Sequence, residues 1–192
     1  LIHGGVYKSN RKRYYEPLWM HFHGAYTLTK SGTPEKPIVI RGAGDGEAIF
    51  DGDGVYRLFD VIYADYTHIE NITIKNCDVA VMAGQRFAHG CQGLVVRNCR
   101  MENVGCGVNA QFGGSKNFYI ADNVILGAKI NLPGWKENWA DIRLGADLLS
   151  FIGIDINGQG HVVCHNYLAY FHDAIDVTEQ GPPESEDWKP CS

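Results

Sequence analysis

The nine residues GLVVRNCRM (93–101) recur, with substitutions, in three other segments of the chain. The other three segments are NITIKNCDV (71–79), NFYIADNVI (117–125) and GHVVCHNYL (160–168). All four carry a β-branched aliphatic residue at their fourth position: Ile74, Val96, Ile120 and Val163. Successive segments begin 22, 24 and 43 residues apart, so the last interval equals about one repeat plus an insertion of similar length. A period near 22 residues with short β-rich runs is typical of a solenoid.

A second set of short runs follows the first set along the chain. Its members are GVNA (107–110), GIDI (153–156) and AIDV (174–177). Residues within each run alternate, so every second side chain faces the interior. The runs are too short for a doubly wound α/β fold, and no helical pattern separates them. We therefore expect one all-β solenoid over residues 1–180, with a loop insertion at 128–150 and a C-terminal loop or linker at 181–192.

The composition of the chain narrows the function classes. Hydrophobic residues make up 45% and charged residues 20% of the 192 residues, which is typical of a globular domain. The formal net charge of −5 argues against nucleic acid as a partner, and no apolar run is long enough for a membrane span. The chain begins at Leu1 without a signal-peptide pattern, and we interpret it as processed or truncated.

The aligned segments resemble the right-handed parallel β-helix repeats of pectate-lyase-like proteins. HGGVY (3–7), SGTPEKPIVIRG (31–42) and GEAIFDG (46–52) are similar to the entry coils of secreted, carbohydrate-active proteins of this kind. The resemblance implies an all-β, single-stranded right-handed parallel β-helix with about 22 residues per coil. It also implies a polysaccharide or oligosaccharide partner and a secreted, periplasmic or cell-surface location. An open end of such a solenoid would need a further domain or self-association to cover it.

The resemblance also gives the seventh position of each segment a structural role. This position is filled by Cys77, Cys99, Asn123 and Asn166. In the resembling proteins it is a turn position that stacks from coil to coil. We expect the two cysteines to be buried thiols rather than a disulfide, because a free cysteine behaves as a small hydrophobe. We expect the two asparagines to form a hydrogen-bonded ladder.

The candidate site is a row of outward-facing polar residues on the second set of runs. In the three runs the residue after the inward aliphatic one is Asn109, Asp155 and Asp176. Stacking would place the two aspartates about 5 Å apart at the backbone, where their charges repel unless they share a proton or bind a cation. A shared proton predicts an acid beside a base, and a cation predicts a calcium site with Asn109 as a further ligand. His172 and Asp173 precede Asp176 and join the catalytic candidates; solvated surface aspartates are the alternative.

The insertion at 128–150 supplies the remaining candidates. Trp135 and Trp139 could stack on sugar rings, or could instead fold the insertion back onto the solenoid. Lys129 and Arg143 are candidate bases from the same insertion, and Arg86 is a third basic residue that could contact the substrate.

Three functions are compatible with these residues. A polysaccharide lyase is favoured, with a basic residue as the base and the acidic row holding calcium. A glycoside hydrolase would use two carboxyls from among Asp155, Asp173 and Asp176. A non-catalytic glycan-binding or adhesion module would need no reaction. We predict binding and cleavage of an extracellular, anionic polysaccharide by β-elimination.

Overall fold

The computed structural model describes residues 1–9, 12–16, 20–85, 89–127 and 152–177. Every regular element in this part of the chain is a β-strand, and it contains no helix. Accordingly, none of its segments is a helix with the length and apolarity needed to cross a membrane. The predicted insertion at 128–150 and the predicted tail at 181–192 lie outside the described residues.

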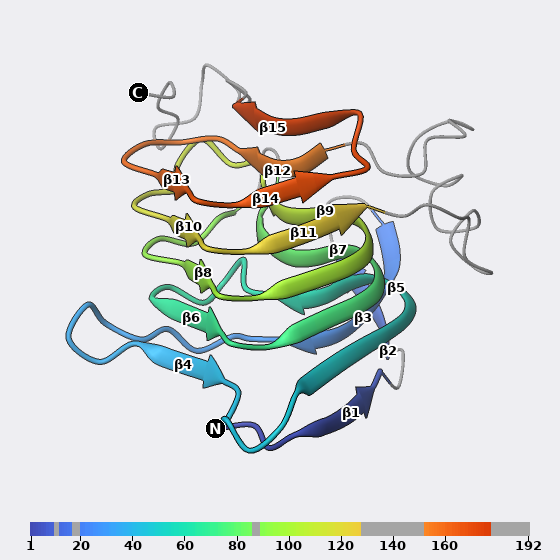
Figure 1. Cartoon of the computed structure of the whole chain (residues 1–192). Coiled ribbons are helices and arrows are strands. Elements are labelled where there is room, and N and C mark those ends of the chain that lie inside the picture. The colour runs from blue at the N-terminus through green and yellow to red at the C-terminus, as the bar shows by residue number, and fades with distance from the viewer. Residues whose placement is uncertain (10–11, 17–19, 86–88, 128–151, 178–192) are drawn as a thin grey trace.

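The strands form two sheets (Figure 1). The ten-stranded sheet contains β1 (Gly5–Lys8), β2 (Lys12–Glu16), β3 (Met20–Thr27), β5 (Ala48–Asp60), β7 (Thr73–Gly84), β9 (Arg100–Ala110), β11 (Val124–Gly127), β12 (Ile152–Ile156), β14 (Tyr167–Ala169) and β15 (Asp173–Val177). The five-stranded sheet contains β4 (Ile38–Arg41), β6 (Thr67–Glu70), β8 (Val95–Arg97), β10 (Tyr119–Ala121) and β13 (Val162–Cys164). Between β4 and β11 the chain alternates between the two sheets. The named strand pairs are parallel except for β2 and β3, which are antiparallel.

The core lies between rows of aliphatic and aromatic side chains contributed by successive strands. In the five-stranded sheet, one row pairs in the order Ile40, Ile69, Val96, Ile120 and Val163. In the ten-stranded sheet, a second row pairs in the order Phe50, Ile74, Met101, Ile125 and Leu168. Both rows belong to one hydrophobic cluster. Each fully buried side chain of this size stabilises the fold by about 1.5–3 kcal/mol.

A two-residue turn carries the chain from the five-stranded sheet to the ten-stranded sheet at four levels. Its first residue has a positive φ each time, and these residues are Asn71, Asn98, Asp122 and His165. Asparagine and aspartate tolerate this left-handed conformation better than most residues. At the second turn position, Asn123 Oδ1 accepts a bond from the Cys99 N–H at 2.9 Å, and Asn166 Oδ1 accepts one from the Asn123 N–H at 3.0 Å. These bonds form the ladder that was predicted for the two asparagines.

The predicted single-stranded right-handed parallel β-helix with about 22 residues per coil is wrong. The described strands divide between two sheets whose strands are parallel, except that the ten-stranded sheet ends in the antiparallel pair β2 and β3. Ile69, Val96, Ile120 and Val163 pair in succession, so the intervals along the chain are 27, 24 and 43 residues rather than a constant 22.

The cause of the error is a misalignment of the first segment. Ile74 was aligned with Val96, but Ile74 pairs with Met101 in the ten-stranded sheet. The dipeptide Asn-Cys occurs at 76–77 and again at 98–99, and both asparagines adopt a positive φ. Asn98-Cys99 forms the turn between β8 and β9, whereas Asn76-Cys77 lies within β7. The same dipeptide with the same backbone conformation therefore suggested a repeat that the strand pairing does not contain.

The cysteines of the described residues are free thiols. Cys77, Cys91, Cys99 and Cys106 are buried, and Cys164 is half-buried. Burial raises the pKa of the Cys99 thiol to about 12, and it raises that of Cys77 well above its ordinary value. The two cysteines do not share a row, because Cys77 pairs with Val55 and Val104.

Candidate functional site

The polar row lies near the C-terminal ends of β5, β7, β9, β12 and β15 in the ten-stranded sheet. Asp155 on β12 pairs with Asn109 on β9 and with Asp176 on β15. The row continues on the other side of Asn109 through Met82 to Asp60. Residues opposite one another on neighbouring parallel strands point to the same face, and neighbouring strands lie about 4.8 Å apart. The structure therefore brings the three predicted residues Asn109, Asp155 and Asp176 together.

Asp155 is held by amide groups rather than by solvent. Its Oδ2 atom accepts a hydrogen bond from Gln111 Nε2 at 2.7 Å and a longer one from Asn109 Nδ2 at 3.5 Å. Only 1% of the Asp155 surface is exposed, and Asn109 is buried as well. The sequence predicted an exposed face here, and the structure corrects that expectation. A carboxylate that is held by amide donors and removed from water has a defined orientation, and its charge interacts strongly with neighbouring groups because little water screens it.

Asp176 and its neighbours are more accessible than Asp155. Asp176 is half-buried on β15. The ring of His172 contacts Asp173, with 3.1 Å between Nδ1 and Oδ2; the His172 side chain is largely exposed and that of Asp173 is about half exposed. Asp173 begins β15 and pairs with Ile152, three residues away from the pairing of Asp176. Strand alternation therefore puts the Asp173 side chain on the opposite face of β15 from Asp176, and the accessible end of the row is the Asp176 carboxylate next to the buried Asp155.

A buried ion pair lies at the other end of the row. Arg57 Nη1 donates to Asp60 Oδ2 at 3.0 Å, and Arg57 Nη2 donates to Gln85 Oε1 at 3.0 Å. Arg57 is only 3% exposed, and Asp60 is also buried. Asp60 Oδ1 additionally accepts from the backbone N–H of Ile62 at 3.3 Å. This end of the face is a fixed network of charged and amide groups.

Four residues of the site were not predicted from the sequence: Gln111, Asp60, Arg57 and Gln85. Gln111 could have been found, because it lies two residues after Asn109. Asp60 could also have been found, because it precedes Met82 by 22 residues. Nothing in the sequence distinguishes Arg57 or Gln85, because their role depends on burial beside Asp60.

The basic and aromatic candidates cannot be placed. Arg86, Lys129, Trp135, Trp139 and Arg143 all lie outside the described residues. Within the described ranges, no three His, Cys, Asp or Glu side chains are grouped closely enough to hold a metal ion. The predicted calcium ligands are two carboxylates and the amide of Asn109, and an asparagine does not count toward a group of His, Cys, Asp and Glu side chains. The calcium site is therefore not tested by this finding and stays a prediction.

No protein-family model, no curated protein and no solved structure matches the chain. The function must therefore be argued from the residues of the site.

Proposed function

We propose that the protein binds and cleaves an extracellular, anionic polysaccharide on the outer face of the ten-stranded sheet. The observation that supports this most is the row Asn109, Asp155 and Asp176, in which a buried, amide-bound carboxylate adjoins an accessible one. Carboxylates and amides are the groups that bind sugar hydroxyls with defined orientation. The secreted, periplasmic or cell-surface location belongs to the same proposal and rests on the sequence resemblance.

The favoured reaction is β-elimination. A base removes the proton from the carbon next to a uronic acid carboxylate, and the electrons of that C–H bond form a carbon–carbon double bond. The bond to the glycosidic oxygen breaks, and this oxygen leaves with a proton. Lys129, Arg143 or Arg86 would supply the base. Asp155 and Asp176 would hold a calcium ion that stabilises the negative charge developing on the substrate carboxylate, with Asn109 as a further oxygen ligand.

Hydrolysis is the second candidate, and the pairing of Asp155 with Asp176 is the observation that favours it. Hydrolysis needs two carboxyl groups, about 5–5.5 Å apart for retention or 6.5–9.5 Å apart for inversion of the anomeric centre. Asp173, the third carboxyl group predicted from the sequence, lies on the opposite face of β15 from Asp176, so Asp155 and Asp176 are the pair that this candidate uses. The two reactions give different products, because only elimination leaves a double bond in the sugar.

The test is a panel of polygalacturonate, alginate and neutral polysaccharides, with and without a chelator. We expect unsaturated products, detected by ultraviolet absorbance, from a uronic acid polymer, and we expect the chelator to reduce the rate. New reducing ends without absorbance would indicate hydrolysis. Binding without either product would indicate a non-catalytic glycan-binding or adhesion module.

The site is tested by replacing Asp176 with Asn. The exchange removes a charge from a half-buried side chain, so turnover should fall about 100-fold or more while the melting temperature stays nearly unchanged. Glu35→Gln is the matched control, because it neutralises an exposed carboxylate in the loop before β4. Full activity of Asp176→Asn would exclude this site.

A further inference from the structure

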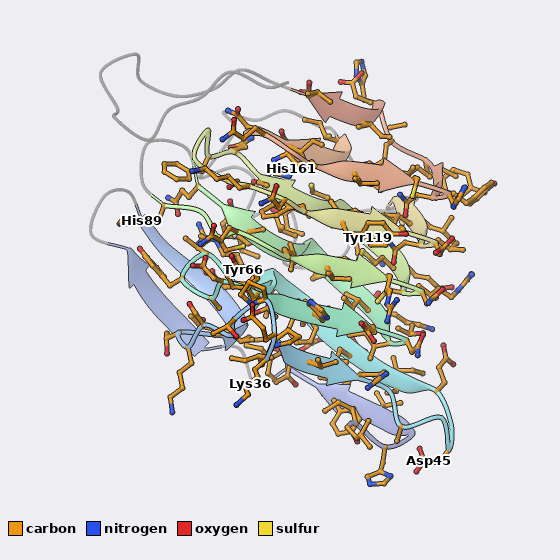
Figure 2. The ribbon with its side chains drawn as sticks, turned by 90° about the vertical axis from the view of Figure 1, so that its left-hand side faces the viewer. Lys36, Asp45, Tyr66, His89, Tyr119 and His161 are labelled. Atoms are coloured by element: carbon orange, nitrogen blue, oxygen red, sulfur yellow. The ribbon has the colours of Figure 1, made fainter. Side chains whose placement is uncertain are left out.

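The outer face of the five-stranded sheet carries two rows of side chains that the proposed site does not use. The first row is charged and runs across β4, β6 and β8 as Arg41, Glu70 and Arg97. The second row is mostly apolar and runs across all five strands as Val39, His68, Val95, Tyr119 and Val162. Figure 2 looks onto this side of the molecule and labels Tyr119 on it.

The charged row has an excess of positive charge. Glu70 is buried between the two arginines, with Arg97 Nε at 3.0 Å and Arg41 Nη1 at 3.7 Å from its carboxylate oxygens. His68 Nδ1 is 3.7 Å from the same carboxylate, but burial lowers the pKa of His68, so this ring is mainly neutral at neutral pH. One carboxylate therefore opposes two guanidinium groups. The Glu70 carboxylate orients both guanidinium groups, and the three side chains together keep a net positive charge.

Both arginines remain available to a ligand. Their side chains are each 46% exposed, whereas the carboxylate that orients them is only 4% exposed. A guanidinium group has five N–H donors in a planar arrangement that matches a carboxylate. The nearby acid Asp122 lies in the turn after β10 rather than on the face, and its carboxylate is 3.6 Å from His165.

The apolar row lies beside these arginines. Tyr119 is 39% exposed, and Val39 and Val162 are also exposed on the same face. Tyr119 is on β10, directly next to the strand that carries Arg97. The apolar face of a pyranose ring packs well on such a surface, and aromatic rings are favoured partners for it. A uronic acid polymer fits both rows, because its sugar rings have an apolar face and carry regularly spaced carboxylates.

We propose that this face is a second binding surface for a carboxylated polysaccharide, separate from the row that contains Asp155. Sugar rings lie over Tyr119 and the neighbouring valines, and carboxylates of the same chain bind Arg41 and Arg97. The identity of the polymer rests on the proposed function, but the surface does not depend on cleavage. Because the whole chain carries a net charge of −5, a polyanion needs a local positive surface of this kind to bind.

The test measures the dissociation constant for polygalacturonate and for alginate by calorimetry, with dextran as the uncharged control polymer. We expect Arg41→Gln combined with Arg97→Gln to weaken binding of the acidic polymer about tenfold and to reduce its salt dependence. Arg41→Gln alone keeps the bond between Arg97 and Glu70, so it should stay folded and lose about threefold. Lys8→Gln removes the same charge from β1 in the other sheet and should change nothing.

Glu70→Gln distinguishes a ligand-binding role of the two arginines from a purely structural role of their ion pairs. It leaves both arginines in place and raises the local charge, so binding of the acidic polymer should become about two- to fivefold tighter at low salt. Unchanged or weaker binding by a folded Glu70→Gln protein would overturn the proposal. Wild-type affinity in the double arginine variant, or no binding of either acidic polymer by the natural protein, would overturn it as well.

A short uronic acid oligosaccharide separates this surface from the proposed active site. Its cleavage should be unchanged in the double arginine variant, because the oligosaccharide does not reach the five-stranded sheet. Loss of polymer affinity in that variant, together with full turnover by Asp176→Asn, would retain the second surface and reject the active site. The opposite pair of results would reject the second surface alone.

Discussion

The end of the ten-stranded sheet that carries the Asp155 row and the outer face of the five-stranded sheet use the same stacking of parallel strands, but they differ in how far their charged side chains are buried. On the ten-stranded sheet, Arg57, Asp60 and Asp155 are almost completely buried. On the five-stranded sheet, the arginines that flank Glu70 remain about half exposed. Strand pairing decides which side chains are neighbours. Burial then decides whether the neighbours become a fixed, water-free site or an accessible charged surface.

This difference has energetic consequences. An ion pair between exposed side chains contributes about 0–1 kcal/mol, because water screens it and both side chains lose freedom. Removal of one partner from a buried pair costs about 3–5 kcal/mol, because it leaves a charge in a poorly solvated place. The same substitution should therefore have very different effects on the two faces.

The largest effect is expected for Asp60→Ala. The substitution removes the carboxylate from the buried Arg57 and also the acceptor for the Ile62 N–H. We expect the free energy of unfolding to fall by about 3–5 kcal/mol, measured by urea denaturation. Arg41→Ala is the counterpart on the five-stranded sheet and should cost less than about 1 kcal/mol, because Arg41 is half exposed, its contact with Glu70 is long at 3.7 Å, and Arg97 keeps its bond to the same carboxylate. Equal losses in the two variants would show that the faces do not differ in solvation.

An intermediate effect is expected for Asn123→Ala at the turn that joins the sheets. Asn123 accepts from the Cys99 N–H and donates to the Val96 carbonyl and to Asn166 Oδ1, each at 2.9 Å. Alanine would leave buried backbone groups without partners, so stability should fall by about 2–3 kcal/mol. Asp122→Asn is the control, because residue 122 is exposed, and asparagine also tolerates its positive φ. It should change stability by less than about 0.5 kcal/mol in the same denaturation experiment.

The smallest effect is expected from pH, through His161 beside the five-stranded sheet. Its Nδ1 accepts from the Phe118 N–H and its Nε2 contacts the Asn157 carbonyl, each at 3.1 Å, which fixes the neutral ring with the proton on Nε2. Burial lowers the pKa of His161 below its ordinary value of 6.5. The unfolded chain thus gains its proton at a higher pH than the folded protein does. The contribution to stability is complete above pH 6.5 and is lost as the pH falls from there through the folded pKa.

Melting temperatures measured between pH 7.5 and pH 5 check this expectation. His161→Gln keeps an acceptor for the Phe118 N–H but does not titrate, so its melting temperature should depend less on pH than that of the natural protein. His68 shifts in the same direction and contributes equally to both proteins. Identical pH profiles of the two proteins would contradict the role given to His161.

Part of the fold could be predicted from the sequence. The alternation of apolar residues correctly predicted strands and inward rows such as Val96, Ile120 and Val163, because stacked parallel strands need an apolar residue at each level. The single-stranded β-helix and its period of about 22 residues were wrong. The dipeptide Asn-Cys occurs once within β7 and once in the turn before β9, and a short local sequence cannot say which strands pair.

The sequence likewise identified Asn109, Asp155 and Asp176 as members of one row, because each follows an inward aliphatic residue in a short strand. It could not show that Asp155 is buried and bound to Gln111, or that Arg57 pairs with Asp60. Burial depends on what covers a face, which is decided by segments far away in the chain. The sequence by itself therefore determined which residues alternate in and out of the strands. Only the tertiary structure decided which polar residues were removed from water, because solvation is a property of the whole packed molecule.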